Sequence, residues 1–232
     1  METTYPLPTS MPVAALGADA RAAFLQRTYV HLFGAILAFA GLEVFLFSSG
    51  LAETIARTML SGSWLLVLGG FMLVSWFASR VAMSSASAAA QYAALAGFVV
   101  AEALIFVPLL YLADTAAPGA IDSAAFVTLL GFAGLTAVAF ITRKDFSFLG
   151  GLLKWLGIVA LVAIVAGVLF GFELGTWFSV AMIAFAGAAI LYDTSNVLHH
   201  FPADRHVGAA LQLFASVALM FWYVLRLFMS RD

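Results

Sequence analysis

The feature that most constrains this chain is a series of seven apolar blocks, each about 20 residues long. A helix of about 20 residues crosses the hydrocarbon core of a bilayer, which is about 30 Å thick. Because that core holds no water, the backbone must bond to itself, which favours helices. The chain has no segments of about 10 residues in which polar and apolar residues alternate, as the strands of a membrane β-barrel need. The pattern therefore predicts an all-α integral membrane protein with seven transmembrane helices.

Short polar segments such as "SSG" and "TRKDFS" separate the blocks, so consecutive helices should be antiparallel neighbours. The predicted spans are residues 28–50, 63–79, 88–112, 123–142, 151–170, 174–197 and 207–229. The residues before the first span are polar and contain proline, without the basic segment and short apolar core of a cleavable signal peptide. We expect a flexible cytoplasmic tail over 1–27 and a seven-helix transmembrane domain over 28–232.

The basic residues are divided unevenly between the two sides of the predicted membrane domain. Seven fall on the side of the N-terminus: Arg21, Arg27, Arg80, Arg143, Lys144, Lys154 and Arg205. Three fall on the other side: Arg57, Arg226 and Arg231. Because cytoplasmic loops are enriched in lysine and arginine, we expect the N-terminus inside and the C-terminus outside.

Composition and residue placement argue against several activities. The net charge is only −2, which indicates no nucleic-acid partner, and the absence of cysteine excludes disulfides and thiolate chemistry. A retinal-type photoreceptor needs a lysine deep in a helix, but Lys144 and Lys154 lie at the predicted inner boundary. An intramembrane aspartyl protease needs two aspartates that share a proton, and the last span contains no acid. The segment "HHFPADRH" at 199–206 is better explained as a solvated turn than as a metal site. We expect no enzymatic activity.

Four ionisable residues fall within or at the ends of the predicted spans: Glu43, Arg80, Glu102 and Asp193. Such residues are costly in a membrane and are functional candidates by default. A rise of about 1.5 Å per residue places Glu43 and Glu102 in the outer half, and Arg80 and Asp193 near the inner ends. This predicts an inner acid–base pair and an outer pair of glutamates. The alternatives are an Arg80 that anchors its helix at the membrane surface, a Glu43 that lies closer to the interface, and a protonated Glu102 that is bonded to nearby backbone.

Asp193 has the strongest support among these candidates. On a helix it shares a face with Ala186, Ala189, Asn196 and His200, at spacings of three and four residues. Small residues on a helix face allow another helix to approach closely. We therefore expect Asp193 to face the bundle, the alternative being an aspartate that simply ends its helix near the headgroups.

Two motifs carry a resemblance to a known family. "ITRKDFSFLGGLL" at 141–153 looks like the inner loop of the transmembrane Bax-inhibitor-motif family, and "ILYDTSNVLHH" at 190–200 resembles the motif that ends its sixth helix. Together with seven spans, these motifs make the chain similar to the family over nearly its whole length. The form of the second motif most resembles the bacterial branch described as modulators of the FtsH-type membrane protease.

The resemblance implies six helices wrapped around a central seventh, and a pH-sensitive calcium leak. In channel-like members two aspartates share a proton and an arginine of the second helix latches onto them. Asp193 matches the first of these aspartates, and Arg80 matches the latch arginine by position. At or beside the position of the second aspartate this chain has Ser216 instead. A serine cannot share a proton as a carboxylate pair does. Calcium prefers six to eight oxygen ligands, and Asp193, Ser216, Asn196 and Gln212 offer few.

Two functional hypotheses follow from the sequence. The first is a channel-like leak protein for cations such as calcium, gated near Asp193 with Arg80 as the closed latch. The alternative is a modulator of a membrane-bound ATP-dependent protease of the FtsH type, acting through the 1–27 tail, with Asp193 bonded to Arg80 or Ser216 as a structural residue. For both we expect a multi-pass protein of the bacterial inner membrane, with no cofactor other than calcium as a candidate ion.

Overall fold

The computed structural model describes residues 11–84 and 87–230. Over these residues the chain forms eight α-helices and a short 3-10 helix, η1 (Val13–Ala15), without a strand. Seven of the α-helices are long and apolar enough to cross a membrane, which confirms the predicted number of spans. They are α1 (Ala18–Ser48), α3 (Trp64–Ser84), α4 (Ala88–Ala116), α5 (Ala120–Thr142), α6 (Leu149–Phe170), α7 (Gly175–His199) and α8 (His206–Met229). The remaining helix, α2 (Leu51–Ser61), is shorter.

The structure corrects the predicted boundary between tail and membrane domain. Helix α1 begins at Ala18, and the segment 11–16 before it is docked on the connection between α7 and α8. The N–H of Val13 donates to the carbonyl of Phe201 at 2.9 Å, the N–H of Ala203 donates to the carbonyl of Met11 at 3.2 Å, and the Val13 side chain is fully buried. A flexible tail over 11–27 is therefore wrong, because apolar side chains in this stretch pack onto the bundle. Residues 1–10 lie outside the described part of the chain.

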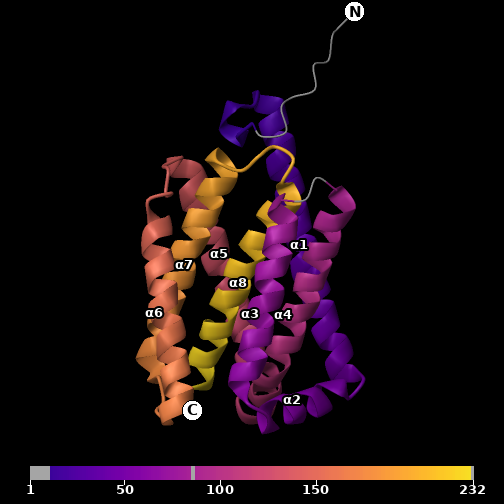
Figure 1. Cartoon of the computed structure of the whole chain (residues 1–232), viewed down its shortest axis with the longest axis vertical. Coiled ribbons are helices and arrows are strands. Elements are labelled where there is room, and N and C mark those ends of the chain that lie inside the picture. Colours follow the sequence, from indigo (N-terminus) through magenta and orange to yellow (C-terminus); the bar gives the residue numbers. More distant parts are fainter. Residues whose placement is uncertain (1–10, 85–86, 231–232) are drawn as a thin grey trace, which may run out of the picture.

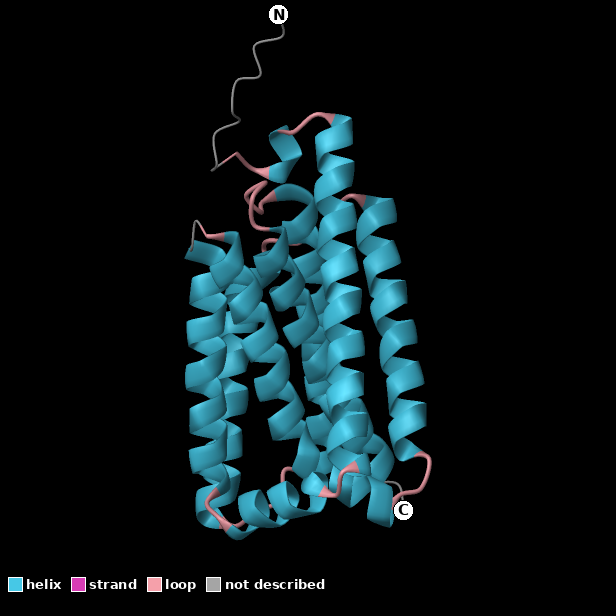
Figure 2. Cartoon of the chain, turned by 90° about the vertical axis from the view of Figure 1, so that its right-hand side faces the viewer, coloured by secondary structure: helices cyan, strands magenta, loops and turns pink. Residues whose placement is uncertain are grey.

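Helix α2 was not predicted from the sequence, where only a connection between the first two spans was expected. It lies across the end of the bundle opposite segment 11–16 (Figure 2). Ala52 and Ala56, one turn apart, are buried against α4, while Glu53 and Arg57 form an exposed ion pair at 2.5 Å. The i,i+4 spacing of both pairs is the local signal of an amphipathic helix.

Helix α8 is the most deeply buried of the seven spans. It packs against α7, α5, α1, α4 and α3, and Figure 1 shows it passing between α7 and α3. In its most apolar stretch 72% of the residues are buried, against 11% in α3 and α6. The outer helices expose large apolar side chains, as with Ile141 and Trp177, in keeping with a lipid environment.

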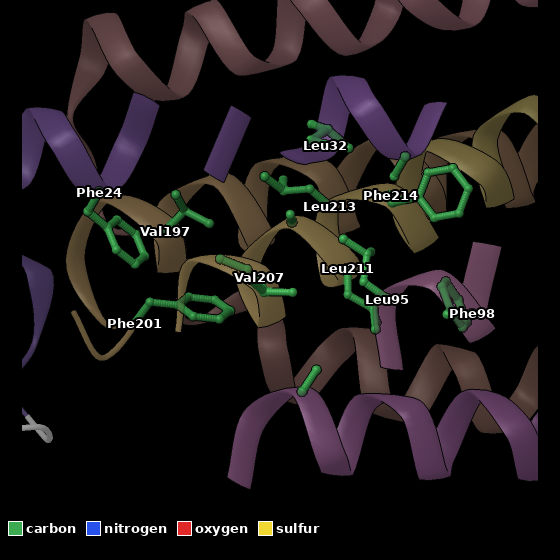
Figure 3. Packing of buried hydrophobic residues seen from close by; sticks show 14 of the residues in the cluster. Phe24, Leu32, Leu95, Phe98, Val197, Phe201, Val207, Leu211, Leu213 and Phe214 are labelled. Atoms are coloured by element: carbon green, nitrogen blue, oxygen red, sulfur yellow. The ribbon is translucent and has the colours of Figure 1, made fainter. Parts of the chain in front are cut away.

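The largest cluster of buried side chains joins α1, α4, α7 and α8 near the end of the bundle that carries segment 11–16 (Figure 3). Leu32, Leu95, Val197 and Leu213 are among its members, and the rings of Phe98 and Phe214 meet edge to face at 6.0 Å. Because lipid tails are as apolar as these side chains, helix association here depends on close packing more than on removal from water. The cluster holds the ends of α7 and α8 in a defined register, which positions the polar side chains described next.

Candidate functional site

Asp193 lies on α7 and is only 3% exposed, so the prediction that it faces the bundle is confirmed. Both of its carboxylate oxygens accept hydrogen bonds from α8. Gln212 donates through Nε2 to Oδ1 at 2.5 Å, and Ser216 donates through Oγ to Oδ2 at 2.5 Å. Gln212 and Ser216 share a face of α8 because they are four residues apart. The three side chains, named here the Asp193 clamp, join α7 to α8 by polar bonds within the apolar interior.

Small residues on α7 allow the close approach that the Asp193 clamp needs. Ala186 is fully buried, and a side chain added at Gly187 would meet Leu135 at 3.4 Å and Met220 at 3.7 Å. Ala189 is only partly buried. The predicted small face is thus present and packs against α5 and α8, in agreement with the role of small residues in membrane helix packing.

Arg80 does not form the predicted pair with Asp193. Its side chain is exposed on α3, where the guanidinium lies 5.5 Å from the ring centre of Trp76, and no hydrogen bond or ion pair joins it to Asp193 in the described structure. Ala78 and Ala82 face the bundle and are buried. Residue 80 stands two positions from each, which on a helix points it away from that face. The geometry agrees with the alternative of a surface anchor.

Glu43 on α1 and Glu102 on α4 are 7% and 5% exposed. Neither oxygen of Glu43 has a hydrogen-bond partner in the described structure, and Glu102 makes no hydrogen bond or ion pair with the described residues either. The two glutamates are not bonded to each other or to backbone. Of the three buried acids, Asp193 therefore has hydrogen-bond partners, whereas Glu43 and Glu102 have none among the described residues.

The histidines of the 199–206 segment do not converge. His199 bonds to the backbone carbonyl of Ser195 at 2.9 Å, His200 bonds to Asp145, and the ring of His206 lies 5.1 Å from that of His31. Among the described residues, no group of three or more histidine, cysteine, aspartate or glutamate side chains is placed to hold a metal ion. This includes Asp193, whose neighbours Gln212 and Ser216 offer donors to its carboxylate.

The two motifs that carry the family resemblance are bonded to each other in the structure, a contact that was not predicted from the sequence. Asp145, between α5 and α6, accepts from the N–H of Ser147 at 2.8 Å and bonds to Nε2 of His200 at 2.9 Å. Ser195 accepts from the N–H of Phe146 at 2.8 Å and approaches Asp145 at 3.4 Å. We name this group the loop clasp. Its only sequence signal was the presence of polar residues in both motifs.

The loop clasp has a charged centre and a close-packed flank. The backbone N–H of Ser147, and after it the side chains of Ser147 and His200, lower the pKa of Asp145 from 3.8 to about 2, so this carboxylate remains ionised across the physiological range. Beside it, a side chain added at Gly150 would stand 2.9 Å from the ring of Tyr192. The clasp therefore fixes the start of α6 against the end of α7.

The fold and these sites define a class: a polytopic helical membrane protein with buried carboxyl groups on three of its spans. The model of the family described as "Inhibitor of apoptosis-promoting Bax1" matches residues 21–232, so the chain belongs to that family. The expected family membership is thereby confirmed.

Two curated relatives illustrate the family in bacteria. An uncharacterised protein of Pseudomonas aeruginosa is 34% identical over 111 residues, covering 47% of this chain and 49% of the relative. The protein named Modulator of FtsH protease YccA, from Escherichia coli, is 34% identical over 108 residues, covering 45% of this chain and 49% of the relative. The same relative from another strain is named an inner membrane protein. The matches span about half the length of these relatives.

Proposed function

We propose that this chain is a non-enzymatic modulator of a membrane-bound, ATP-dependent protease of the FtsH type in the bacterial inner membrane. The observation that carries the proposal is the Asp193 clamp. Both oxygens of Asp193 are held by Gln212 and Ser216, so α7 and α8 are joined where a gate based on Asp193 would have to open. The name of the Escherichia coli relative supports the same partner.

The docked segment 11–16 suggests how such modulation works. A protease that pulls on the N-terminus would first meet the bonds between Val13 and Phe201 and between Ala203 and Met11, and then the packed bundle. A chain that is engaged at its end but resists extraction occupies the protease and lowers its action on other substrates. The proposal therefore assigns engagement to residues 1–10, which precede the docked residues, in place of the whole of 1–27.

The test is copurification with the protease after deletion of residues 2–10 from the full chain. We expect copurification to be lost while thermal unfolding of the bundle is unchanged, because the deletion stops short of Met11 and the docked segment. A control replaces 2–10 with a glycine–serine segment of equal length, which separates the need for length from the need for sequence. Copurification that survives the deletion contradicts the proposal.

The proposal includes a central α8 and an N-terminus in the cytoplasm. The burial of α8 against five other spans supports the first point, and the distribution of basic residues supports the second. The chain has no native cysteine, so single cysteines can be labelled cleanly. With Lys144→Cys we expect an impermeant maleimide to react only from the cytoplasmic side, and with Ser123→Cys only from the other. The reverse pattern would overturn the orientation.

A cation leak is the second candidate, favoured by the three buried carboxyl groups of Glu43, Glu102 and Asp193. Intramembrane acids commonly mark ion pathways. Conduction past Asp193 would require its bonds to Gln212 and Ser216 to break. The test is calcium flux in proteoliposomes, where Asp193→Asn should change the rate or its pH dependence and Asp145→Asn, in a loop outside the spans, should not. Wild-type vesicles no leakier than protein-free vesicles would exclude this function.

A further inference from the structure

A large hollow opens on the side of the bundle, between the pair α3 and α4 and the pair α6 and α8. Its volume is about 900 Å³, within the roughly 300–1,000 Å³ typical of small-molecule sites. Helices α3 and α6 barely touch each other, and lining residues on both, Met72 and Val168, are 43% and 45% exposed. Because these two helices otherwise present apolar side chains outward, the hollow opens toward lipid.

Two polar groups in the wall of this hollow, Glu102 and Ser75, have no partner among the described residues. Glu102 lines it, is only 5% exposed, and makes no hydrogen bond with the described residues. The hydroxyl of Ser75, on the facing helix α3, is also buried without a partner there. A buried polar group without a partner is costly in an apolar interior, and each such group in a native structure calls for an explanation. Two in one cavity point to a ligand that supplies hydrogen-bond donors.

Aromatic rings form much of the remaining lining. Phe106 and Trp222 meet edge to face at 5.0 Å, and Phe71 and Phe98 lie 6.3 Å apart. The faces of such rings attract cations, most strongly where water is excluded. A carboxyl group surrounded by aromatic and aliphatic side chains is complementary to a molecule with a cationic head and an apolar body.

The other charged lining residues do not alter this complementarity. Glu173 lies in the connection between α6 and α7, and Arg226 lies in the last turn of α8. Both also line a second, smaller cavity at that end of the bundle, so they belong to its surface and offset each other in charge. Glu102 is thus the acid of the buried wall. An acyl chain would fill the same volume but would leave Glu102 and Ser75 without partners.

We propose that this hollow binds a protonated lipophilic amine that enters from the bilayer. The ammonium group donates to the carboxylate of Glu102 and to the hydroxyl of Ser75, and the apolar body lies against Phe71, Phe106 and Trp222. The site is separate from the Asp193 clamp and from segment 11–16. Its test is therefore independent of the test of protease modulation.

The test is binding of tritiated dodecylamine to the full-length protein in nanodiscs, measured by scintillation proximity. We expect saturable binding that unlabelled dodecylamine displaces and that dodecanol, of equal chain length without the charge, does not. Glu102→Gln should weaken binding at least about tenfold, because it removes the charge opposite the ammonium. Ser75→Ala, a milder change, should weaken it about threefold.

Two further variants control for folding and for volume. Glu43→Gln removes the other unpartnered buried acid, which does not line the hollow, and should leave binding unchanged. Ala160→Phe fills the hollow from α6 while keeping Glu102, and should abolish binding. Equal displacement by dodecanol would show a site for acyl chains instead. Three results would each overturn the proposal: equal displacement by dodecanol, an unchanged affinity in Glu102→Gln, or the absence of saturable binding.

Discussion

Asp193 and Glu102 are buried to nearly the same extent, 3% and 5% exposed, yet their surroundings are opposite. Asp193 has a donor for each oxygen, supplied by residues four apart on α8, whereas Glu102 faces a hollow and has no partner among the described residues. The first arrangement holds two helices together, and the second is suited to receive something from outside. Burial alone therefore does not assign a role to an intramembrane acid; the partners of its oxygens do.

The largest expected effect comes from removing the satisfied acid. Asp193→Ala leaves the donors of the partly buried Gln212 and the buried Ser216 unpaired, and should lower the free energy of unfolding by about 3 kcal/mol. Asp193→Asn keeps one acceptor and should cost about 1 kcal/mol. Denaturant unfolding in mixed micelles measures both. Equal losses from the two variants would show that the hydrogen bonds of the clamp contribute little.

The loop clasp is a second group of contacts that holds the end of α7, and Gly150→Ala tests its contribution. The added methyl group would stand 2.9 Å from the ring of Tyr192, so we expect a loss of about 1–2 kcal/mol in the same assay. Gly97→Ala on α4 is the matched control, since nothing lies within 4 Å of its added methyl group. A loss at Gly150 as large as that of Asp193→Ala would shift the anchoring role to the clasp.

Replacing the unpartnered acid should have a smaller effect on stability. Glu102→Leu removes a buried polar group that makes no bond, so the free energy of unfolding should change by less than about 1 kcal/mol, toward greater stability. The assay is the one used for Asp193→Ala. Marked destabilisation by Glu102→Leu would show that Glu102 has a structural partner and would remove the contrast between the two acids.

The smallest effect concerns Asp145, an acid that has partners but is exposed. Its pKa in the folded protein, about 2, is below the ordinary value of 3.8, so its contribution is present above about pH 4 and is lost as the pH falls toward 2. Screening by solvent keeps this contribution small. A carbon-13 titration of the Asp145 carboxyl group should give a midpoint near 2 in the wild type. In His200→Ala the midpoint should rise, and an unchanged midpoint would exclude His200 as a partner.

Much of the fold could be predicted because its signals are local. The boundaries of α5, α6, α7 and α8 lie within three residues of those expected from the apolar blocks. Helix α2 was missed because its amphipathic pattern is short, and segment 11–16 because its bonds are to the distant residues Phe201 and Ala203.

The candidate site was foreseen less completely than the fold. The proximity of Ser216 to Asp193 was expected and is present, but Arg80 was paired with Asp193 on depth and on the position of the family's latch arginine, and this pair is absent from the described structure. Depth follows from the rise of a helix, whereas the direction of a side chain depends on how the helix is rotated against its neighbours. The loop clasp was not predicted, because its bonds join Asp145 to Ser195 and His200, which are about 50 residues away in the chain.

By itself, the sequence determined the number of spans, their helical form and the family motifs. The physical reason is that a bilayer leaves each apolar block with its own backbone as hydrogen-bond partner, so the outcome is settled within the block. Only the tertiary structure decided that Asp193 is satisfied, that Arg80 faces outward and that Glu102 lines an open hollow. Each of these depends on which face of one helix meets another, and that is set by packing between segments far apart in the chain.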